Sequence, residues 1–357
     1  MNTFILTILV VGLSGIVAQV LLLRELLVSF YGNELTIGII LANWIICEAA
    51  GVFIIGKFID RVKNKINIFF ILQLIFSITL PLSIYFARTF KSIFGVPFGE
   101  AIGLYTINFT SLFIILVVGF CHGALFSTLC KIYTLVHTNI KESETPIGKI
   151  YTWETIGTIC GGIIFTFLFI PHLNSFQIAF LVSFFNLIIC LFFFRRVTKI
   201  FRYILLLLIF LIGYLSLNGG INYIHRLSID KLWNNQQVLD YRNSVYGNIT
   251  VTKQLEQYTF FYNGIPTITT PYPDKQFVED FGHLPLLFHR APKDILIISA
   301  GAGGLINEIL KHPIKNLDYA ELDPLIIDML EDYPTKLTES ELRERRVYVI
   351  NIDGRFF

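Results

Sequence analysis

Charged residues are scarce in this chain of 357 residues, where Asp, Glu, Lys and Arg together make up 15%. Soluble domains carry roughly 25% charged residues. This chain is 54% hydrophobic instead, so much of its length is expected to lie in lipid. Residues 1–221 hold 14 Lys or Arg and 8 Asp or Glu (net +6), and residues 222–357 hold 14 and 18 (net −4), which sums to +2. An acidic C-terminal part lacks the basic surface that nucleic acids require, which excludes nucleic acid as a partner.

Cysteine pairs with redox or metal-binding spacing are also missing. The chain has 5 cysteines, all in apolar runs and none spaced C-x-x-C from another: Cys47, Cys121, Cys130, Cys160 and Cys190. We expect them to be small buried side chains, with neither a disulfide framework nor a metal site.

Long apolar runs fill the N-terminal part. A membrane-spanning helix needs about 20 mostly apolar residues, and seven segments qualify: 3–23, 35–56, 66–87, 104–129, 152–170, 175–194 and 200–217. The first lacks a basic start and a small-residue cleavage site, so we expect a retained helix rather than a signal peptide. The sequence predicts a multi-pass α-helical membrane domain over residues 1–221, with the lipid bilayer as its partner.

A few polar and small residues interrupt these segments. Gly157 and Gly161 form G-x-x-x-G, a spacing that favours close helix packing and makes a homo-oligomer through glycine-rich faces an expectation. Arg24 and Glu25 end the first segment and are expected at the membrane interface. Glu48 lies in mid-segment, where two interpretations stay open: an interhelical hydrogen bond, or part of a polar transport path.

The C-terminal part has a different pattern. Residues 222–290 are predicted to be a linker and a small antiparallel β element, since "YGNITVTK", "YTFFYNG" and "IPTITT" are β-like and Asn263-Gly264 is a hairpin signal. In residues 291–357 the strand-like runs "DILIIS", "NLDYAEL" and "RVYVIN" alternate with helix-like runs. Such alternation predicts a parallel α/β sheet of the Rossmann type.

A glycine-rich loop, Gly301-Ala302-Gly303-Gly304, lies between the first of these strands and the next helix. A helix N-terminus offers free N–H groups and a positive dipole end. Glu321 ends the second strand, where a carboxylate can accept hydrogen bonds from ribose hydroxyls, and Asp353 closes the third strand within reach of an adenine. Ile306 replaces the third glycine of G-x-G-x-x-G, so a glycine turn without a ligand stays open as the alternative.

At these residues the sequence resembles the spermidine synthases (polyamine aminopropyltransferases). The resemblance runs from Tyr246 to Phe357 over "YGNITV", "YNGIPT", "HLPLLFH", "DILIISAGAGGLINEILKHP", "YAELDP" and "INIDGRFF". The stretches "LLRELLVSFYGNEL", "GKFIDR" and "YTWETIGTICGG" are similar to the membrane half of bacterial membrane-fused relatives. The resemblance implies a small β domain before a methyltransferase-like Rossmann domain, located at the bacterial inner membrane. The implied substrates are decarboxylated S-adenosylmethionine (or S-adenosylmethionine) and a diamine such as putrescine.

The family's site residues transfer only in part. Glu321 matches its ribose-binding acid and Asp353 its adenine-side aspartate, and the loop Gly301 to Gly304 completes the expected nucleoside site. Tyr246, Glu279 and His283 are the substrate-binding candidates that the resemblance implies.

Three positions depart from the family pattern. Ala302 stands where the family has an aspartate that binds the aminopropyl ammonium, Phe277 where a tyrosine is usual, and Gly247 where a glutamine is frequent. The nucleoside half of the site is therefore kept better than the amine half.

The family's catalytic aspartates follow its fourth Rossmann strand in a D-x-x-D-P motif. This sequence ends at Phe357, after the third strand, so the catalytic residues are expected beyond Phe357, the Rossmann domain is expected to be incomplete, and the chain alone is expected to be inactive. Three functions stay open: aminopropyl transfer, a membrane transporter or sensor with a nucleoside- or polyamine-binding domain, and methyl transfer from S-adenosylmethionine.

The distribution of Lys and Arg indicates which loops lie on the cytoplasmic side of the membrane, because cytoplasmic loops are enriched in these residues. The loops after the second, fourth and sixth segments hold 11 of them (4 + 3 + 4), and the alternate loops hold 3. This predicts a cytoplasmic N-terminus, and seven crossings then put residues 222–357 outside. S-adenosyl substrates are made in the cytoplasm, so the side of the C-terminal part stays open.

Overall fold

The computed structural model describes residues 2–97, 99–136, 146–192, 198–234 and 236–357. The chain divides into two compact units, Met1–Asn234 and Asn235–Phe357. The first unit is helical, and the second combines two small sheets with short helices.

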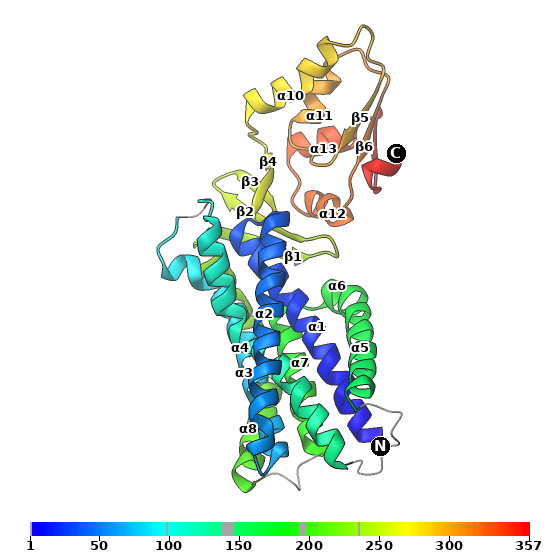
Figure 1. Cartoon of the computed structure of the whole chain (residues 1–357). Coiled ribbons are helices and arrows are strands. Elements are labelled where there is room, and N and C mark those ends of the chain that lie inside the picture. The colour runs from blue at the N-terminus through cyan, green and yellow to red at the C-terminus, as the bar shows by residue number, and fades with distance from the viewer. Residues whose placement is uncertain (1, 98, 137–145, 193–197, 235) are drawn as a thin grey trace. The chain divides into compact units, whose positions relative to one another are not determined.

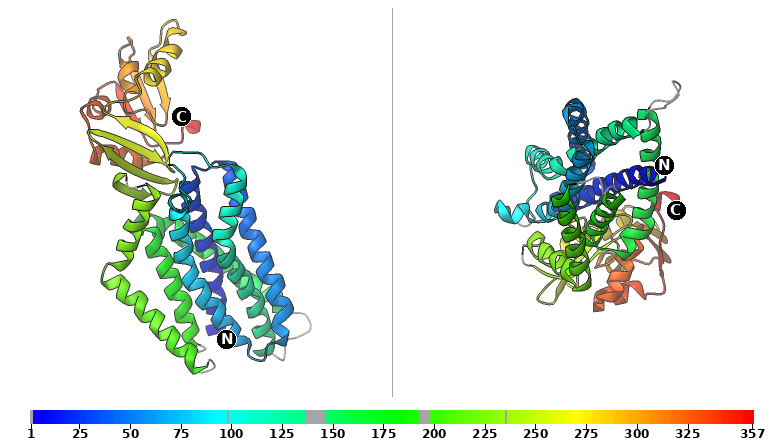
Figure 2. Two further views of the ribbon diagram at one scale, coloured as in Figure 1. Left: turned by 90° about the vertical axis from the view of Figure 1, so that its left-hand side faces the viewer. Right: turned by 90° about the horizontal axis from the view of Figure 1, so that it is seen from below.

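Long apolar helices build the first unit and run along a common axis (Figures 1 and 2). They are α1 (Asn2–Phe30), α2 (Glu34–Phe58), α3 (Lys65–Ile93), α4 (Leu104–Val136), α5 (Pro146–Ile164), α7 (Ser175–Phe192) and α8 (Lys199–Leu217). Shorter elements are η1 (Ile59–Arg61), the π-helical turn η2 (Phe165–Phe169), α6 (Ile170–His172) and α9 (Gly220–Leu232). In the part of the chain that the structure describes, 7 helices are long and apolar enough to cross a membrane, and they coincide with the segments predicted from the sequence.

The division between the units falls after α9, whereas the sequence-based boundary lay after residue 221. Helix α9 contacts α3, α7 and α8, and its Ser228, Ile229 and Leu232 side chains are buried. These contacts make α9 part of the helical unit.

Helix α1 continues through Arg24 and Glu25, which therefore do not end it. Glu25 is buried against Arg88 of α3, and the two form a bidentate pair with Nε–Oε2 at 2.6 Å and Nη2–Oε1 at 2.9 Å. The guanidinium also donates to Ser228 of α9 at 2.9 Å and to Ser175 of α7 at 3.2 Å. This network joins the four helices α1, α3, α7 and α9.

The glycines of the G-x-x-x-G motif lie in the contact between α5 and α1. A Cβ at Gly157 would lie 2.1 Å from the Leu9 carbonyl oxygen, and one at Gly161 would lie 2.9 Å from the Leu13 Cα. The motif therefore serves packing within one chain, and a homo-oligomer through glycine-rich faces stays a prediction.

The second unit begins with an antiparallel sheet in the order β1 (Gln237–Asn243), β2 (Asn248–Gln254), β3 (Gln257–Tyr262) and β4 (Ile265–Thr270). The predicted hairpin at Asn263-Gly264 joins β3 to β4, and both residues have positive φ, 48° and 82°. Such left-handed conformations are what asparagine and glycine tolerate in two-residue hairpin loops. The β element thus has four strands.

A parallel sheet follows in the order β5 (Asp294–Ile298), β6 (Asn316–Ala320) and β7 (Val347–Ile350). Helix α10 (Lys275–Leu287) precedes it, α11 (Leu305–Leu310) links β5 to β6, and α12 (Pro324–Asp332) and α13 (Lys336–Leu342) link β6 to β7. A 3-10 turn, η4 (Gly354–Phe356), follows β7. This confirms the predicted strand–helix alternation.

Both sheets share one hydrophobic core. Phe260 and Ile268 of the antiparallel sheet belong to the same buried cluster as Ile297, Ile306 and Tyr319. The register pairs Ile298 with Ala320, and Ala320 with Ile350, so the three parallel strands end side by side. Residues that follow these strands are therefore brought to one edge of the sheet.

Candidate functional site

A pocket of about 160 Å³ lies at the carboxyl ends of β5 and β6. Its walls come from β3 and β4, from the loop after β5, and from the turn after β6. The lining residues are Tyr262, Thr267, Ile268, Ser299, Ala300, Glu321, Leu322, Asp323 and Ile326. The pocket thus contains the predicted ribose-binding acid and the two residues that precede the glycine-rich loop, whereas none of Gly301 to Gly304 is among its lining residues.

Glu321 is 1% exposed and is held by protein donors. Its Oε2 accepts from the Ala300 N–H at 3.0 Å and the Tyr319 hydroxyl at 2.8 Å. Its Oε1 accepts from the Leu322 N–H at 3.1 Å and the Ser299 hydroxyl at 3.3 Å. Burial, together with the negative charge of Glu321, raises the pKa of Tyr319, so this phenol stays a donor. The carboxylate is fixed in the pocket wall.

The loop that reaches Glu321 has an unusual backbone. Ser299 and Ala300 have φ of 64° and 51°, the left-handed region that costs ordinary residues roughly 1–2 kcal/mol each. This conformation turns the Ala300 N–H toward Glu321. Gly303 then passes close to β4, where an added Cβ would lie 2.8 Å from Ile268 Cγ2. Only glycine fits that approach.

The N–H groups that follow in the loop are already bonded. Glu341 of α13 accepts from Gly303 and Gly304 at 2.7 Å each and from Asn307 at 3.0 Å. Burial raises the pKa of Glu341, and these three bonds counteract part of the rise. The sequence-based expectation of free N–H groups at this helix start is therefore wrong, because α13 places its own carboxylate there.

Asp353 follows β7, and β7 pairs with β6, the strand that Glu321 follows. The Ile352 N–H donates to the Glu321 carbonyl at 3.1 Å, which keeps the two chain segments together. The Asp353 carboxylate binds the Arg355 N–H at 3.0 Å and the Arg355 Nε at 3.1 Å. These contacts with Arg355 lower the pKa of Asp353 to about 2. Asp353 is close along the sheet edge but is not among the residues that line the pocket.

Tyr246 and Ala302 occupy different surroundings. Tyr246 is 46% exposed in the turn between β1 and β2, and Ser244 of this turn donates to the carboxylate of Asp323, a pocket residue. Ala302 is 4% exposed and belongs to the hydrophobic core. The position where the family has an ammonium-binding aspartate is thus apolar and buried here.

Glu279 and His283 lie on α10, outside the pocket lining. Glu279 is exposed. The His283 ring has Nε2 at 3.0 Å from Glu308 Oε2 and Nδ1 at 2.8 Å from His312 Nε2, which ties α10 to α11. The structure does not bring these two residues to Glu321, and their substrate-binding role stays a prediction.

Sequence reasoning missed several residues of the site. Asp323 could have been found, since Asp before Pro324 is a helix-start signal, and the Asp323 carboxylate caps α12 at the Leu325 N–H. Tyr262 and Glu341 carry no local signal, because only packing brings the β3 end and α13 to this edge.

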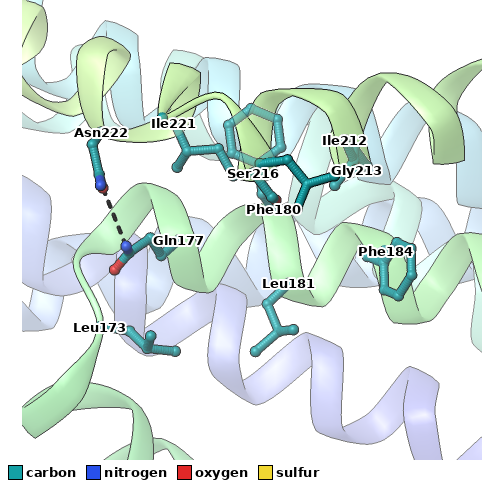
Figure 3. Close-up of a pocket in the computed structure, with 12 residues that line it drawn as sticks. Leu173, Gln177, Phe180, Leu181, Phe184, Ile212, Gly213, Ser216, Ile221 and Asn222 are labelled. Atoms are coloured by element: carbon teal, nitrogen blue, oxygen red, sulfur yellow. Dashed lines mark hydrogen bonds between the residues drawn. The ribbon is translucent and has the colours of Figure 1, made fainter.

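A larger pocket of about 460 Å³ lies in the helical unit between α7, α8 and the start of α9 (Figure 3). Its lining is mostly apolar, with Phe180, Phe184 and Ile212 among the residues drawn. Gln177 donates from Nε2 to Asn222 Oδ1 at 3.1 Å at its polar end. No lining residue carries a charge, so this pocket lacks the acid that a ribose or a polyamine site needs.

Comparisons with known proteins show which families this chain is similar to. Residues 275–357 match the family model described as "Spermine/spermidine synthase domain". The chain is 24% identical over 278 residues to polyamine aminopropyltransferase 2 of Aquifex aeolicus, covering 77% of this chain and 56% of that protein. It is 33% identical over 87 residues to the polyamine aminopropyltransferase of Methanocaldococcus jannaschii, covering 24% and 29%. The spermidine synthase structure from Thermotoga maritima matches at 27% identity and a TM-score of 0.31, covering 34% and 42%.

The C-terminal segment 275–357 thus matches a model for spermine/spermidine synthase domains, which confirms the resemblance over that segment. The chain carries a helical region before it. The Aquifex match covers 77% of 357 residues, about 275, whereas the second unit has 357 − 234 = 123, so the match extends into the helical unit. The chain spans about half the length of the curated relatives that it matches: 56% of the Aquifex protein and 43% of the polyamine aminopropyltransferase of Leptospira interrogans.

Proposed function

We propose that this protein is a membrane-anchored, spermidine synthase-like aminopropyltransferase of polyamine biosynthesis. It would move an aminopropyl group from decarboxylated S-adenosylmethionine to a diamine such as putrescine. The amine nitrogen attacks the methylene carbon bonded to the sulfonium, the carbon–sulfur bond breaks, methylthioadenosine leaves, and the amine loses a proton. Such a displacement depends chiefly on positioning the two reactants.

The position of Glu321 carries this proposal. Its carboxylate stands in the wall of the pocket, at the carboxyl end of a parallel strand, where nucleosides bind in sheets of this type. The Ser299 hydroxyl makes its longest contact, at 3.3 Å. A ribose hydroxyl would replace that contact and leave the other three donors in place.

Glu341 favours a nucleoside without phosphates. Dinucleotides and nucleotides place their phosphates on free N–H groups at a helix start. Here Gly303 and Gly304 donate to a buried carboxylate instead. A negative charge at this place repels a phosphate but is compatible with a sulfonium cation.

The charge of the second unit suits a diamine. Residues 235–357 contain 12 Lys or Arg and 17 Asp or Glu, a net charge of −5. An excess of negative charge raises the local concentration of a polyamine cation. The long apolar helices of the first unit support anchoring in a bilayer, because their length and composition suit one.

Calorimetry with methylthioadenosine on the full chain in detergent tests the nucleoside site. Glu321→Gln should weaken binding at least about tenfold, because a charge-assisted hydrogen bond contributes roughly 1.5–3 kcal/mol. Glu331→Gln on the exposed side of α12 removes the same charge away from the pocket and should bind as the parent does. ADP should bind neither protein measurably. Equal affinity of Glu321→Gln and the parent, or tighter binding of ADP than of methylthioadenosine, would contradict the proposal.

A further inference from the structure

Three ionisable side chains from three different helices meet inside the helical unit. His122 of α4 lies between Glu48 of α2 and Glu154 of α5. His122 Nδ1 is 2.7 Å from Glu48 Oε1, and His122 Nε2 is 3.8 Å from Glu154 Oε1. The side chains of His122, Glu154 and Glu48 are 7%, 15% and 32% exposed, so the imidazole is the most enclosed of the three.

The cluster lies near the middle of the bundle. Gly15 stands halfway along α1, and a Cβ there would be 2.0 Å from His122 Nε2. A helix rises 1.5 Å per residue, which puts Gly15 about 20 Å from either end of α1. Ionisable groups at such depth in an apolar bundle are costly, and they commonly mark ion pathways or proton relays.

The second ring nitrogen of His122 has no partner with regular hydrogen-bond geometry. Within the part of the chain that the structure describes, His122 Nε2 is buried and makes no such bond, although the Val11 backbone of α1 also interacts with the ring. It points at Glu154 across a gap slightly too long for a hydrogen bond. A buried ring nitrogen without a regular hydrogen bond is destabilising, so its persistence calls for a ligand or a second state of the site.

The other helices that pack against α4 add no charge to the imidazole. Among the described residues, its ion pairs are with Glu48 and Glu154. Helix α1 presents Gly15 and the uncharged Val11 backbone, and α3 makes no ion pair with the ring. Cys130, also on α4, lies within electrostatic range of Glu154. No group of three His, Cys, Asp or Glu side chains in the described ranges has a metal-site arrangement. Two carboxylates beside one imidazole in an apolar setting favour a small cation that needs no cavity, and the proton is that cation.

We propose that Glu48, His122 and Glu154 form a proton-transfer site in the helical unit, with His122 Nε2 as the accepting atom and Glu154 as the group that delivers the proton. The Glu48 carboxylate accepts from His122 Nδ1–H, which leaves the lone pair of Nε2 facing Glu154. When α5 and α4 approach by about 1 Å, the gap reaches hydrogen-bond length. The O–H bond of protonated Glu154 then breaks and an N–H bond forms at Nε2, giving a carboxylate and an imidazolium with no net gain or loss of protons.

Nitrogen NMR of the histidine rings tests this site in the ¹⁵N-labelled full chain, reconstituted in lipid bilayers. The His122→Gln spectrum identifies the His122 signals. Between about pH 5 and pH 9, the parent ring should change between one and two bound protons. In Glu154→Gln the doubly protonated ring should be lost at the pH where the parent shows it. Glu34→Gln, at the exposed start of α2, is the matched control and should keep the parent spectrum.

The titration of the parent protein tests whether His122 takes up a second proton, even if a variant folds poorly. A His122 ring that keeps one proton on a fixed nitrogen over the whole pH range overturns the proposal. So does a well-folded Glu154→Gln protein, monodisperse and helical like the parent, whose His122 signals are unchanged.

Discussion

The carboxylate of Glu341 accepts a hydrogen bond of 2.7 Å from the backbone N–H of Gly304, the residue that precedes α11. The same carboxylate binds the Gly303 N–H at 2.7 Å, so α13 supplies from within the chain the anion that a glycine-rich loop commonly takes from a ligand. This relationship ties the glycine-rich loop to a helix nearly forty residues further along the chain.

Removing this carboxylate should destabilise the second unit. Glu341→Ala leaves three N–H donors without this acceptor, two of them buried, and we expect a loss of about 2–4 kcal/mol in unfolding free energy. Inorganic phosphate should restore part of the loss, because the vacated N–H groups then bind it. Thermal unfolding with and without phosphate measures both effects. Glu339→Ala on the same helix, which loses only an exposed ion pair with Arg343, should change little. A Glu341→Ala protein as stable as the parent would disprove the expected role.

The aminopropyl arm should add little to nucleoside affinity. Ala302 is neutral and buried where a carboxylate would bind the ammonium, and such a contact is ordinarily worth 2–5 kcal/mol. Calorimetry should give affinities for methylthioadenosine and decarboxylated S-adenosylmethionine that differ by no more than about fivefold. A retained contact would make the difference larger than about tenfold, because each 1.4 kcal/mol changes affinity tenfold. A hundredfold preference for the decarboxylated compound would show that another group binds the arm.

The α1–α5 contact depends on glycine. Gly157→Ala puts a methyl group 2.1 Å from the Leu9 carbonyl oxygen, so the helices must separate. We expect a loss of about 1–3 kcal/mol, seen as a lower melting temperature in detergent. Gly162→Ala on the same helix meets open space and is the control. Equal melting temperatures for the two variants would rule out this close packing.

The network around Arg88 should contribute more to the stability of the helical unit than a surface ion pair does. Arg88→Met leaves the buried Glu25 carboxylate unpaired, which costs about 3–5 kcal/mol. The double variant Glu25→Gln with Arg88→Met removes the lone charge and should recover a large part of that loss. Melting temperatures of the two variants in the same detergent give the comparison. A double variant less stable than Arg88→Met alone would contradict this account.

Sidedness can be decided by two reporters. Lys141, Arg195 and Arg196, which contribute to the basic loops, lie outside the described residues, but the predicted charge bias also includes Lys57, Arg61, Lys63 and Lys65. We expect a reporter fused after Lys65 to be cytoplasmic. With seven crossing helices, a reporter after Ile221 should be on the opposite side. Reporters on the same side would mean an even number of crossings and a cytoplasmic second unit, and an external Lys65 reporter would reverse the whole topology.

Local patterns in the sequence were sufficient to predict much of the architecture. Apolar runs marked the long helices, Asn263-Gly264 marked the hairpin, and strand–helix alternation placed Glu321 at a strand end. Each of these signals depends on residues that are neighbours in the chain, so periodicity and turn chemistry reveal them without knowledge of the packing.

Only the tertiary structure decided which distant side chains meet. Glu25 and Arg88 are 63 positions apart, Glu48 and His122 are 74 apart, and Gly303 and Glu341 are 38 apart. Nothing in the local pattern around Glu48 indicates an imidazole beside it, and nothing around the glycine-rich loop indicates an internal carboxylate. These contacts arise because helices and strands bury their apolar faces together, and that packing fixes which buried charges must share a partner.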